Sequence, residues 1–402
     1  MNESQKALCA LLRTALWEEP YGTETEIPWQ EVFQEADEQA VTLLFADILG
    51  KLPMPPEISE EWESRNERQY SDNMRLLYEQ DEFRKGMEEE NIPFLILKGS
   101  AAAVYYPNPM LRTMGDVDVI VRREDLGKAR AWMEKEGFFS LNPKDKDPRE
   151  YQYSKDGVPF ELHSRFSIFN EREKDTLLDG WIYEAAEQAE AGQMDVYTFP
   201  MAGKTLNGLV LLAHVNQHLE EGLGLRQIID WIMYVKQELT DEKWESFRDK
   251  AEQLGMMKLA KASARAGQIY LGLPEKGYSW CMDLEPEICE SLMEYIFECG
   301  NFGMKGGVHN DVTMVMSHGK GIQGFFRNLQ RRGEGNWTVL KRAPWLRPFA
   351  WIYQAGRYVS KGIRRGISVK ELKADAAASR RRNALTEALG TTQLARRDSS
   401  PR

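Results

Sequence analysis

Asp116 and Asp118, separated by a single residue, are well suited to bind a metal ion. Strict alternation of residue types after Asp116 predicts a strand over 117–121. Residues two apart on a strand point to the same face, so both carboxylates face one side while the valines face the core. Two adjacent carboxylates repel each other unless a cation joins them, and Mg²⁺ commonly binds such carboxylates together with substrate phosphates. The alternative is a turn aspartate beside an exposed one.

A third carboxylate, Glu161, belongs to a predicted strand over 158–163, which forms a hairpin with 151–154 across Asp-Gly. If this strand lies beside 117–121, Glu161 joins the aspartates, and three carboxylates on two strands can bridge two metal ions and activate an attacking hydroxyl. The alternative is a solvated residue on an open sheet face. His163 points to the same side as Glu161 and either has a role at the metal or only hydrogen-bonds a neighbour.

A corner of small residues precedes the aspartates. A short apolar run predicts a strand over 94–97, and Lys98, Gly99 and Ser100 then turn the chain into a predicted helix over 101–106. Gly99 has no Cβ, so a phosphate can approach its backbone, and the first amides of a helix favour anions. Ser100 can cap the helix or donate to a phosphate oxygen. Lys98 either reaches a phosphate or lies on the surface.

Weaker signals come from further residues with chemistry-bearing side chains. Arg112 either stabilises the charge of a leaving pyrophosphate or forms a salt bridge in its loop. His214 and His218 lie at i and i+4, on one helix face, where they either line a substrate cleft or pack structurally. We do not expect them to bind zinc, because no third ligand is in view. Asp230 we expect to pair with Arg226, one helical turn before it.

These motifs resemble a known family. The segment LKGSAAAVYYPNPMLRTMGDVDVIV, followed by FELHSRF, resembles an uncharacterised bacterial nucleotidyltransferase family with Leu-Lys-Gly, Arg-x-x-Gly-Asp-x-Asp and Glu-Leu-His motifs. That family belongs to the nucleotidyltransferase superfamily related to DNA polymerase beta. The resemblance is strong over 94–166 and weaker over 211–231, where similar proteins carry a His-rich helix followed by an Arg and an Asp.

The resemblance implies a role for each matching residue. Gly99 and Ser100 would cradle the nucleoside triphosphate, and Asp116 and Asp118 would hold the divalent metal ions. Glu161 would be the third carboxylate, which helps to deprotonate the acceptor hydroxyl.

We therefore expect an enzyme: a nucleotidyltransferase, dependent on Mg²⁺ or Mn²⁺, that moves a nucleotidyl group from a nucleoside triphosphate, ATP, to a hydroxyl and releases pyrophosphate. The acceptor is left open among a small molecule, a sugar, a peptide, a protein and a tRNA. Two alternatives remain. One is a kinase-like phosphotransferase on the same site, which would release a nucleoside diphosphate. The other is a catalytically inactive nucleotide-binding regulatory protein.

The expected fold class is α+β. A small mixed-sheet nucleotidyltransferase core over 93–170 would lie between a helical region at 1–92 and a second one at 171–300, which would form a wall of the cleft. The glycine-rich segment 301–325 predicts a flexible loop. The remaining residues, 326–402, form a basic tail rich in aromatic residues, and we expect its last 25 or so residues to be disordered.

Charge is distributed unevenly along the chain. The net charge is −11, yet the tail from residue 326 onward holds 18 Lys and Arg against 5 Asp and Glu. The acidic remainder argues against a general nucleic-acid binder. The basic tail could contact RNA or an anionic membrane surface, or it could pack its aromatic side chains on the acidic body.

Composition narrows the class of protein. The chain has 402 residues, of which 42% are hydrophobic and 29% charged, and these values exclude a mostly disordered or collagen-like chain. No apolar run approaches the roughly 18 residues of a membrane span, and the first residues do not have the pattern of a signal peptide. The four cysteines show no CxxC spacing, which is typical of reduced thiols. We expect a cytoplasmic protein with no transmembrane segment.

Overall fold

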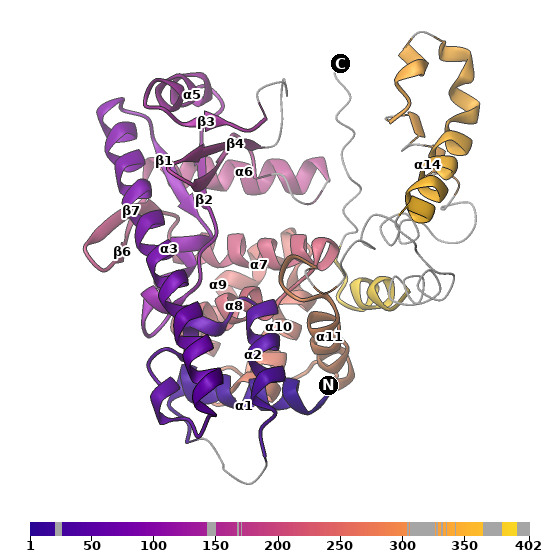
Figure 1. Ribbon diagram of the computed structural model, residues 1–402. Coiled ribbons are helices and arrows are strands. Elements are labelled where there is room, and N and C mark those ends of the chain that lie inside the picture. The colour runs from indigo at the N-terminus through magenta and orange to yellow at the C-terminus, as the bar shows by residue number, and fades with distance from the viewer. Residues whose placement is uncertain are drawn as a thin grey trace. The chain divides into compact units, whose positions relative to one another are not determined.

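The structure is a computed structural model. It describes residues 1–20, 26–142, 150–166, 169, 171–303, 305, 326, 329–330, 333–334, 336–341, 343–364 and 380–391. The chain divides into two compact units, Met1–Lys305 and Gly306–Arg402, and each is described by itself. The first unit holds one seven-stranded mixed sheet surrounded by helices (Figure 1), which confirms the α+β class.

The centre of the sheet is built from the strands that the sequence predicts. The strand order is β3-β4-β5-β2-β1-β7-β6. Strand β2 runs antiparallel to β1 and parallel to β5, and β5 forms a hairpin with β4. Five adjacent strands make up this part of the sheet: β1 (Phe94–Leu97), β2 (Val117–Val121), β3 (Phe139–Ser140), β4 (Glu150–Lys155) and β5 (Val158–His163).

The sheet extends beyond the expected core. The sequence predicts a single strand over 195–199 within a helical region, but the structure has a hairpin of β6 (Glu190–Met194) and β7 (Tyr197–Met201). Asp195 occupies the hairpin turn at φ +50°, a backbone conformation that aspartate tolerates better than most residues. Strand β7 pairs in parallel with β1, so the sheet does not end at residue 170.

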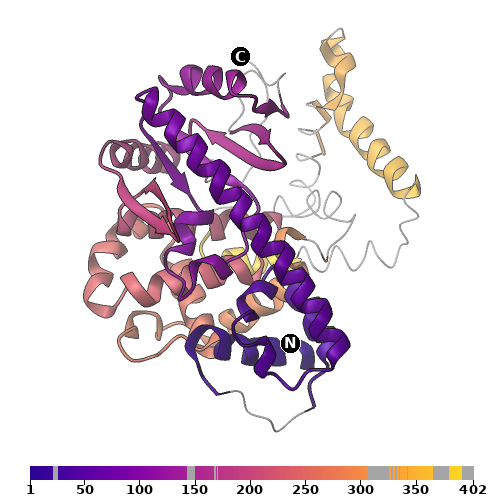
Figure 2. The same cartoon turned by 60° about the vertical axis from the view of Figure 1, so that its left-hand side comes forward.

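One face of the sheet is covered by α3 (Pro56–Glu89) and α5 (Leu126–Lys135), and Figure 2 shows α3 running past the strands toward the N-terminal helices. The ring of Phe83 on α3 lies 5.6 Å from that of Phe94 and 5.8 Å from that of Phe160. Because side chains alternate along a strand, Asp118 and Glu161 point to the opposite face.

Helix α3 also takes part in a second hydrophobic cluster near its N-terminus. Trp62 is fully buried there, with ring contacts of 5.3 Å to Phe33 and 5.1 Å to Phe45. Phe33 belongs to α2 (Trp29–Glu38), which follows α1 (Glu3–Trp17). The apolar spacing over 40–48 predicts a helix, but Ala40 has φ +55° and only the 3₁₀ turns η1 (Thr42–Phe45) and η2 (Leu49–Lys51) follow it.

The remaining helices of the first unit follow the sheet segments. A short helix, α4 (Gly99–Ala103), and the 3₁₀ turn η3 (Pro109–Leu111) lie between β1 and β2. Asn207 on α7 donates through Nδ2 to the carbonyl of Ala101, 2.8 Å away, and so ties α7 to α4. The later helices are α6 (Arg172–Glu187), α7 (Lys204–Glu221), α8 (Leu225–Glu238), α9 (Asp241–Gln253), α10 (Met257–Leu271) and α11 (Pro286–Cys299), with the 3₁₀ turn η4 (Ser279–Cys281) between the last two.

The second unit contains η6 (Thr338–Lys341), η7 (Pro344–Phe349) and α14 (Ala350–Arg364). Some of its aromatic side chains pack on one another: Trp337 stacks on Tyr353 with ring centroids 5.0 Å apart. Residues 380–388 are helical, in contrast to the disorder expected for the last 25 or so residues. Most of the glycine-rich segment and residues 392–402 lie outside the described residues. None of the described helices is long and apolar enough to cross a membrane.

Replacing Gly86 by alanine tests the packing of α3 on α5. A Cβ at this position would lie 1.8 Å from the Trp132 ring, which itself packs on Phe83. We expect Gly86→Ala to lower the free energy of unfolding by about 1–3 kcal/mol in a denaturant titration, because the ring must move. Gly180→Ala is the control: a methyl group on this helical glycine of α6 would have no atom within 4 Å, so a gain of about 0.5–1 kcal/mol is expected. Equal effects of the two changes would contradict the packing argument.

Candidate active site

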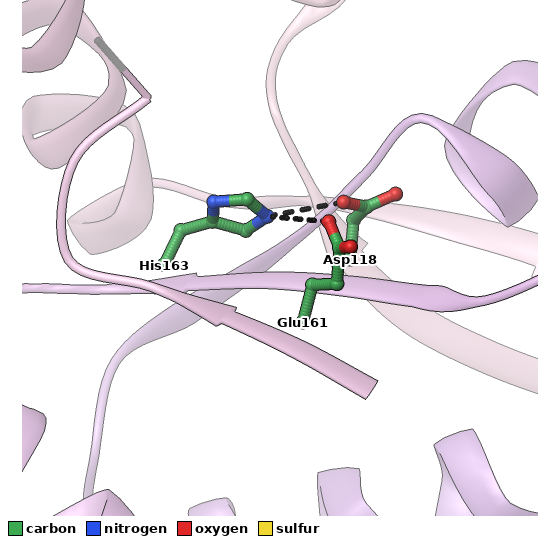
Figure 3. A group of neighbouring side chains, drawn as sticks. All are labelled: Asp118, Glu161 and His163. Carbon is green, nitrogen blue, oxygen red and sulfur yellow. Dashed lines mark hydrogen bonds and ion pairs between the residues drawn. The ribbon is translucent and has the colours of Figure 1, made fainter. Parts of the chain in front are cut away.

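Asp118, Glu161 and His163 converge on the face of the β2–β5 pair opposite α3, and Figure 3 shows their polar ends pointing toward one another. Asp118 lies opposite Glu161 in the parallel register, as the strand pattern predicts. His163 Nε2 is 3.0 Å from Asp118 Oδ1 and 3.6 Å from Glu161 Oε2. One ligand atom from each of the three residues lies within 4.8 Å of the other two, so together they could hold a metal ion.

Lys98 supplies a positive charge to this cluster. It directly follows β1, whose last residue, Leu97, pairs with Asp118, and its Nζ lies 2.6 Å from Asp118 Oδ1. Lys98 is buried rather than on the surface. Its backbone has φ +50° and ψ −133°, and this sparsely populated conformation turns the chain sharply from β1 into α4.

The buried charges of the cluster stabilise one another. Burial alone would raise the pKa of Asp118, but the ammonium of Lys98 and the hydrogen bond from His163 hold that pKa below its usual range. Burial opposes the charged form of Lys98, yet Asp118 and Asp116 outweigh it and raise the Lys98 pKa. Burial likewise opposes a charged His163, but its hydrogen bond to Asp118 and the nearby carboxylate of Glu161 raise the pKa of the imidazole.

Asp116 lies just before β2, beside this cluster. Burial, followed by repulsion from Asp118, raises its pKa to about 6. Within the described part of the chain, no salt bridge reaches its carboxylate. The sequence groups Asp116 with Asp118 and Glu161. In the structure the tightest cluster instead consists of Asp118, Glu161 and His163, and Asp116 lines the adjoining pocket.

Gly99 and Ser100 have different surroundings. Gly99 lines the pocket beside the cluster, and its φ of +24° is one that residues with a Cβ rarely adopt. The buried hydroxyl of Ser100 instead donates to Gln80 Oε1 on α3, 2.8 Å away. The side chain of Ser100 thus fixes the corner to α3, and its hydroxyl does not face the pocket.

Arg112 forms a buried salt bridge with Asp230 on α8. Its Nε and Nη2 donate to Asp230 Oδ1 and Oδ2 at 2.9 and 2.6 Å, and the Tyr106 hydroxyl donates to Oδ1 at 2.7 Å. The expected pairing of Asp230 with Arg226 is therefore wrong. A bidentate partner from a distant loop takes the place of the neighbour one turn away on the helix, because two parallel bonds to one carboxylate are stronger than a single contact.

A pocket of about 170 Å³ adjoins the cluster. It brings together residues that the sequence singles out as candidates for the site and others that it does not. The former are Lys98, Gly99, Arg112, Asp116, Asp118, Glu161, His214 and His218; the latter are Glu150, Gln217, Arg226 and Phe302. Alternation along the hairpin could have indicated Glu150, which pairs with His163. Nothing in the sequence around Phe302 points to a site.

His214 and His218 meet on the α7 wall of this pocket. Their Nε2 atoms are 2.8 Å apart, so one ring donates and the other accepts. Burial, followed by repulsion from His218, lowers the pKa of His214 well below its usual value, which keeps that imidazole neutral. Among the described residues, only the group of Asp118, Glu161 and His163 has the spacing of metal ligands, so the α7 pair has no third ligand.

Replacing Arg112 by lysine tests the buried salt bridge. Arg112→Lys keeps the charge but loses one of two bonds to Asp230, so we expect the free energy of unfolding to fall by about 1.5–3 kcal/mol. Arg248→Lys is the control. Arg248 pairs with Glu245 and Asp249 on the solvent side of α9, and there we expect a change within about 0.5 kcal/mol. Urea titrations of both variants give the comparison, and equal losses would contradict a special role for the Arg112 pair.

The donor set fits a divalent cation. Carboxylate oxygens are the ligands preferred by Mg²⁺ and Mn²⁺, and an imidazole also suits transition metals. Asp118 Oδ1 already accepts from Lys98 and His163, which leaves its Oδ2, together with the carboxylates of Asp116 and Glu161, to face a cation. A mixed sheet here presents carboxylates to a pocket that is also lined by a lysine and two arginines, an arrangement suited to a divalent cation beside an anionic group.

A comparison with known families identifies the family of the chain. Residues 25–272, more than half of the chain, match the family described as uncharacterised nucleotidyltransferase. The chain belongs to this family, which confirms the resemblance found in the sequence. The search of curated proteins gave no match to the chain.

Proposed function

We propose that the protein transfers a nucleotidyl group from a nucleoside triphosphate, ATP, to a hydroxyl acceptor in a reaction that depends on Mg²⁺ or Mn²⁺ and releases pyrophosphate. The observation that carries this proposal is the register of β2 on β5. That register sets Asp118 beside Glu161 on the sheet face that borders a pocket also lined by Lys98, Arg112 and Arg226.

The acidic side of the pocket would hold the cation. Asp116, Asp118 and Glu161 are the proposed ligands, and a bound cation would neutralise phosphate charge. His163 donates to Asp118 Oδ1 and so orients that carboxylate, as a hydrogen-bonded partner of a metal ligand does. Lys98 holds the cluster together by compensating two or more negative charges in a buried setting.

The size of the pocket suggests which part of the substrate it takes. About 170 Å³ is less than the 300–1,000 Å³ typical of pockets that enclose a whole small molecule. We assign it to the phosphate chain, with the backbone of Gly99 and the side chains of Lys98 and Arg112 as proposed phosphate contacts. The acceptor hydroxyl would then approach from the open side of the pocket, near Glu161, whose side chain is 22% exposed.

Labelled nucleotides test the proposal. The purified protein is incubated with a cell extract, Mg²⁺ and each nucleoside triphosphate in turn, carrying a label on either the α or the γ phosphate. We expect the α label to enter an acceptor and pyrophosphate to accumulate. Transfer of the γ label with release of a nucleoside diphosphate would show a kinase instead. Transfer of neither label would contradict both activities. Mg²⁺-dependent nucleotide binding in calorimetry without transfer would favour the nucleotide-binding regulatory alternative, and no binding would contradict that alternative as well.

A further inference from the structure

We infer that Arg226 forms an anion-binding subsite on the α8 side of the pocket, and that it binds the β and γ phosphates of the nucleotide. The inference deepens the proposed function and rests on it. Three observations on this side chain carry it: its burial, its lack of an acidic partner and its position in the pocket wall.

The side chain of Arg226 is buried, and no carboxylate among the described residues forms an ion pair with it. The residue is 8% exposed, and an arginine so deeply buried is usually paired with an acid. The nearest acid along the helix is Asp230, and both of its oxygens are engaged by Arg112 and Tyr106. Within the described residues Arg226 forms no salt bridge.

The hydrogen-bonding capacity of Arg226 is also largely unused. Its Nη1 donates to the carbonyl of Thr113, 3.1 Å away, while its buried Nε has no partner among the residues that the structure describes. Burial, followed by repulsion from Arg112, lowers the pKa of Arg226, and the attraction of Asp230 and Asp116 does not reverse the shift. A guanidinium in this condition has donors and charge available for an anion.

The other two cations of the pocket are already paired. Lys98 contacts Asp118 at 2.6 Å, and Arg112 contacts Asp230 at 2.6 Å. Of these three pocket cations, Arg226 is the one whose charge is not matched by a carboxylate in the described structure. It lines the same pocket as Gly99 and Asp116, so an anion bound there would lie next to the acidic cluster.

The guanidinium is held in place by its neighbours. Its central carbon lies 5.3 Å from the ring of Phe302, and that ring is 4.8 Å from the ring of His218. Gln227 Nε2 donates to Asn301 Oδ1 at 2.9 Å, which fixes the segment that carries Phe302 to the start of α8. A planar guanidinium held in one orientation offers the fork of parallel donors that phosphate oxygens accept.

The transfer step explains why the outer phosphates belong at this cation. The bond between the α phosphorus and its bridging oxygen breaks as a bond to the acceptor oxygen forms. The acceptor hydroxyl passes its proton to the carboxylate of Glu161, and pyrophosphate leaves with the electron pair of the broken bond. Negative charge therefore grows on the leaving group. A fixed guanidinium that faces the leaving group stabilises that charge without reorganising.

Binding of inorganic tripolyphosphate tests the subsite without any transfer reaction. Calorimetry in the presence of Mg²⁺ compares the wild-type chain with Arg226→Gln, Arg226→Lys and the control Arg265→Gln. Arg265 lies on α10, bonds to Gln268 and Glu275, and does not line the pocket. We expect Arg226→Gln to weaken binding about 10- to 100-fold, Arg226→Lys to weaken it less, and Arg265→Gln to bind as the wild type does.

Thermal melting shows that any loss is not due to unfolding. We expect the Tm of Arg226→Gln without ligand to equal or exceed that of the wild type, because the change removes an unbalanced buried charge. Tripolyphosphate should raise the Tm of the wild type and of Arg265→Gln, with little effect on Arg226→Gln.

Two results would overturn the inference. One is an Arg226→Gln variant that binds tripolyphosphate as tightly as the wild type does. If that variant also has a raised KM for an anionic acceptor, Arg226 binds the acceptor and not the nucleotide. The other is no binding of tripolyphosphate by the wild type. Binding that depends on Arg226 in a chain that transfers no nucleotidyl group would uphold the phosphate subsite and refute the proposed transferase activity, so the two failures are distinguishable.

Discussion

Asp116→Asn is expected to lower nucleotidyl transfer by more than about 100-fold while leaving the protein folded. Asp116 is a proposed ligand of the cation, and loss of a ligand should cost more than the 10- to 100-fold that follows loss of a ligand's hydrogen-bonding partner. The side chain can be neutralised without harm to the fold, because the folded protein already disfavours its charge: its pKa is raised to about 6.

The sign of the stability change follows from that pKa. The carboxyl is charged at pH 7.5 in both folded and unfolded chains, but its ionised form is less favourable in the folded one, so an uncharged amide should leave the Tm unchanged or raise it. Transfer kinetics and a thermal melt of Asp116→Asn give both results. Glu150→Gln, which changes another pocket carboxylate outside the proposed ligand set, is the matched control and should retain more activity. An Asp116→Asn enzyme with near-normal transfer rates would exclude Asp116 from the metal site.

Asp118→Asn is expected to abolish transfer and also to destabilise the protein by about 3–5 kcal/mol. The change leaves the buried ammonium of Lys98 without its closest partner, and an unpaired buried charge carries a penalty of this size. The sequence alone suggests that either aspartate can be removed with the fold intact. The structure separates them, because only Asp118 is bonded to Lys98 and His163.

A double variant distinguishes the lost ion pair from other causes of instability. Lys98→Met combined with Asp118→Asn removes both charges, and replacing a buried pair by uncharged groups is often close to neutral. We expect urea titration to show most of the stability regained while transfer remains abolished. If the double variant is as unstable as the sum of the single ones, Lys98 and Asp118 do not stabilise each other.

The strands that carry the acids could be predicted from the sequence because each is a local pattern. The alternation around Asp118 and around Glu161 gave the correct face for both side chains, and the parallel register then placed them side by side. The positions of the central strands were predicted nearly to their bounds for the same reason. Family membership followed from motifs that lie within these elements.

The placement of the arginine side chains in the pocket could not be predicted in this way, because it depends on tertiary contacts. Helical spacing favours a pair between Arg226 and Asp230, but a loop more than 100 residues away delivers Arg112 to that carboxylate. The burial of the Ser100 hydroxyl against α3 is a tertiary contact of the same kind. The β6–β7 hairpin was missed because its first strand, with Gly192 at its centre, lacks the β-branched and aromatic residues of a typical strand.

Helix α3 has a consequence for any attempt to dissect this protein. Trp62 and Phe83 lie about 32 Å apart along one uninterrupted helix, and each anchors a different hydrophobic cluster. A fragment that begins after α3 would leave the rings of Phe94 and Phe160 bare to water on one side of the sheet. The sheet therefore cannot be exchanged on its own. Chimaeras with other transferases should take the whole of α3 and the sheet from the same parent.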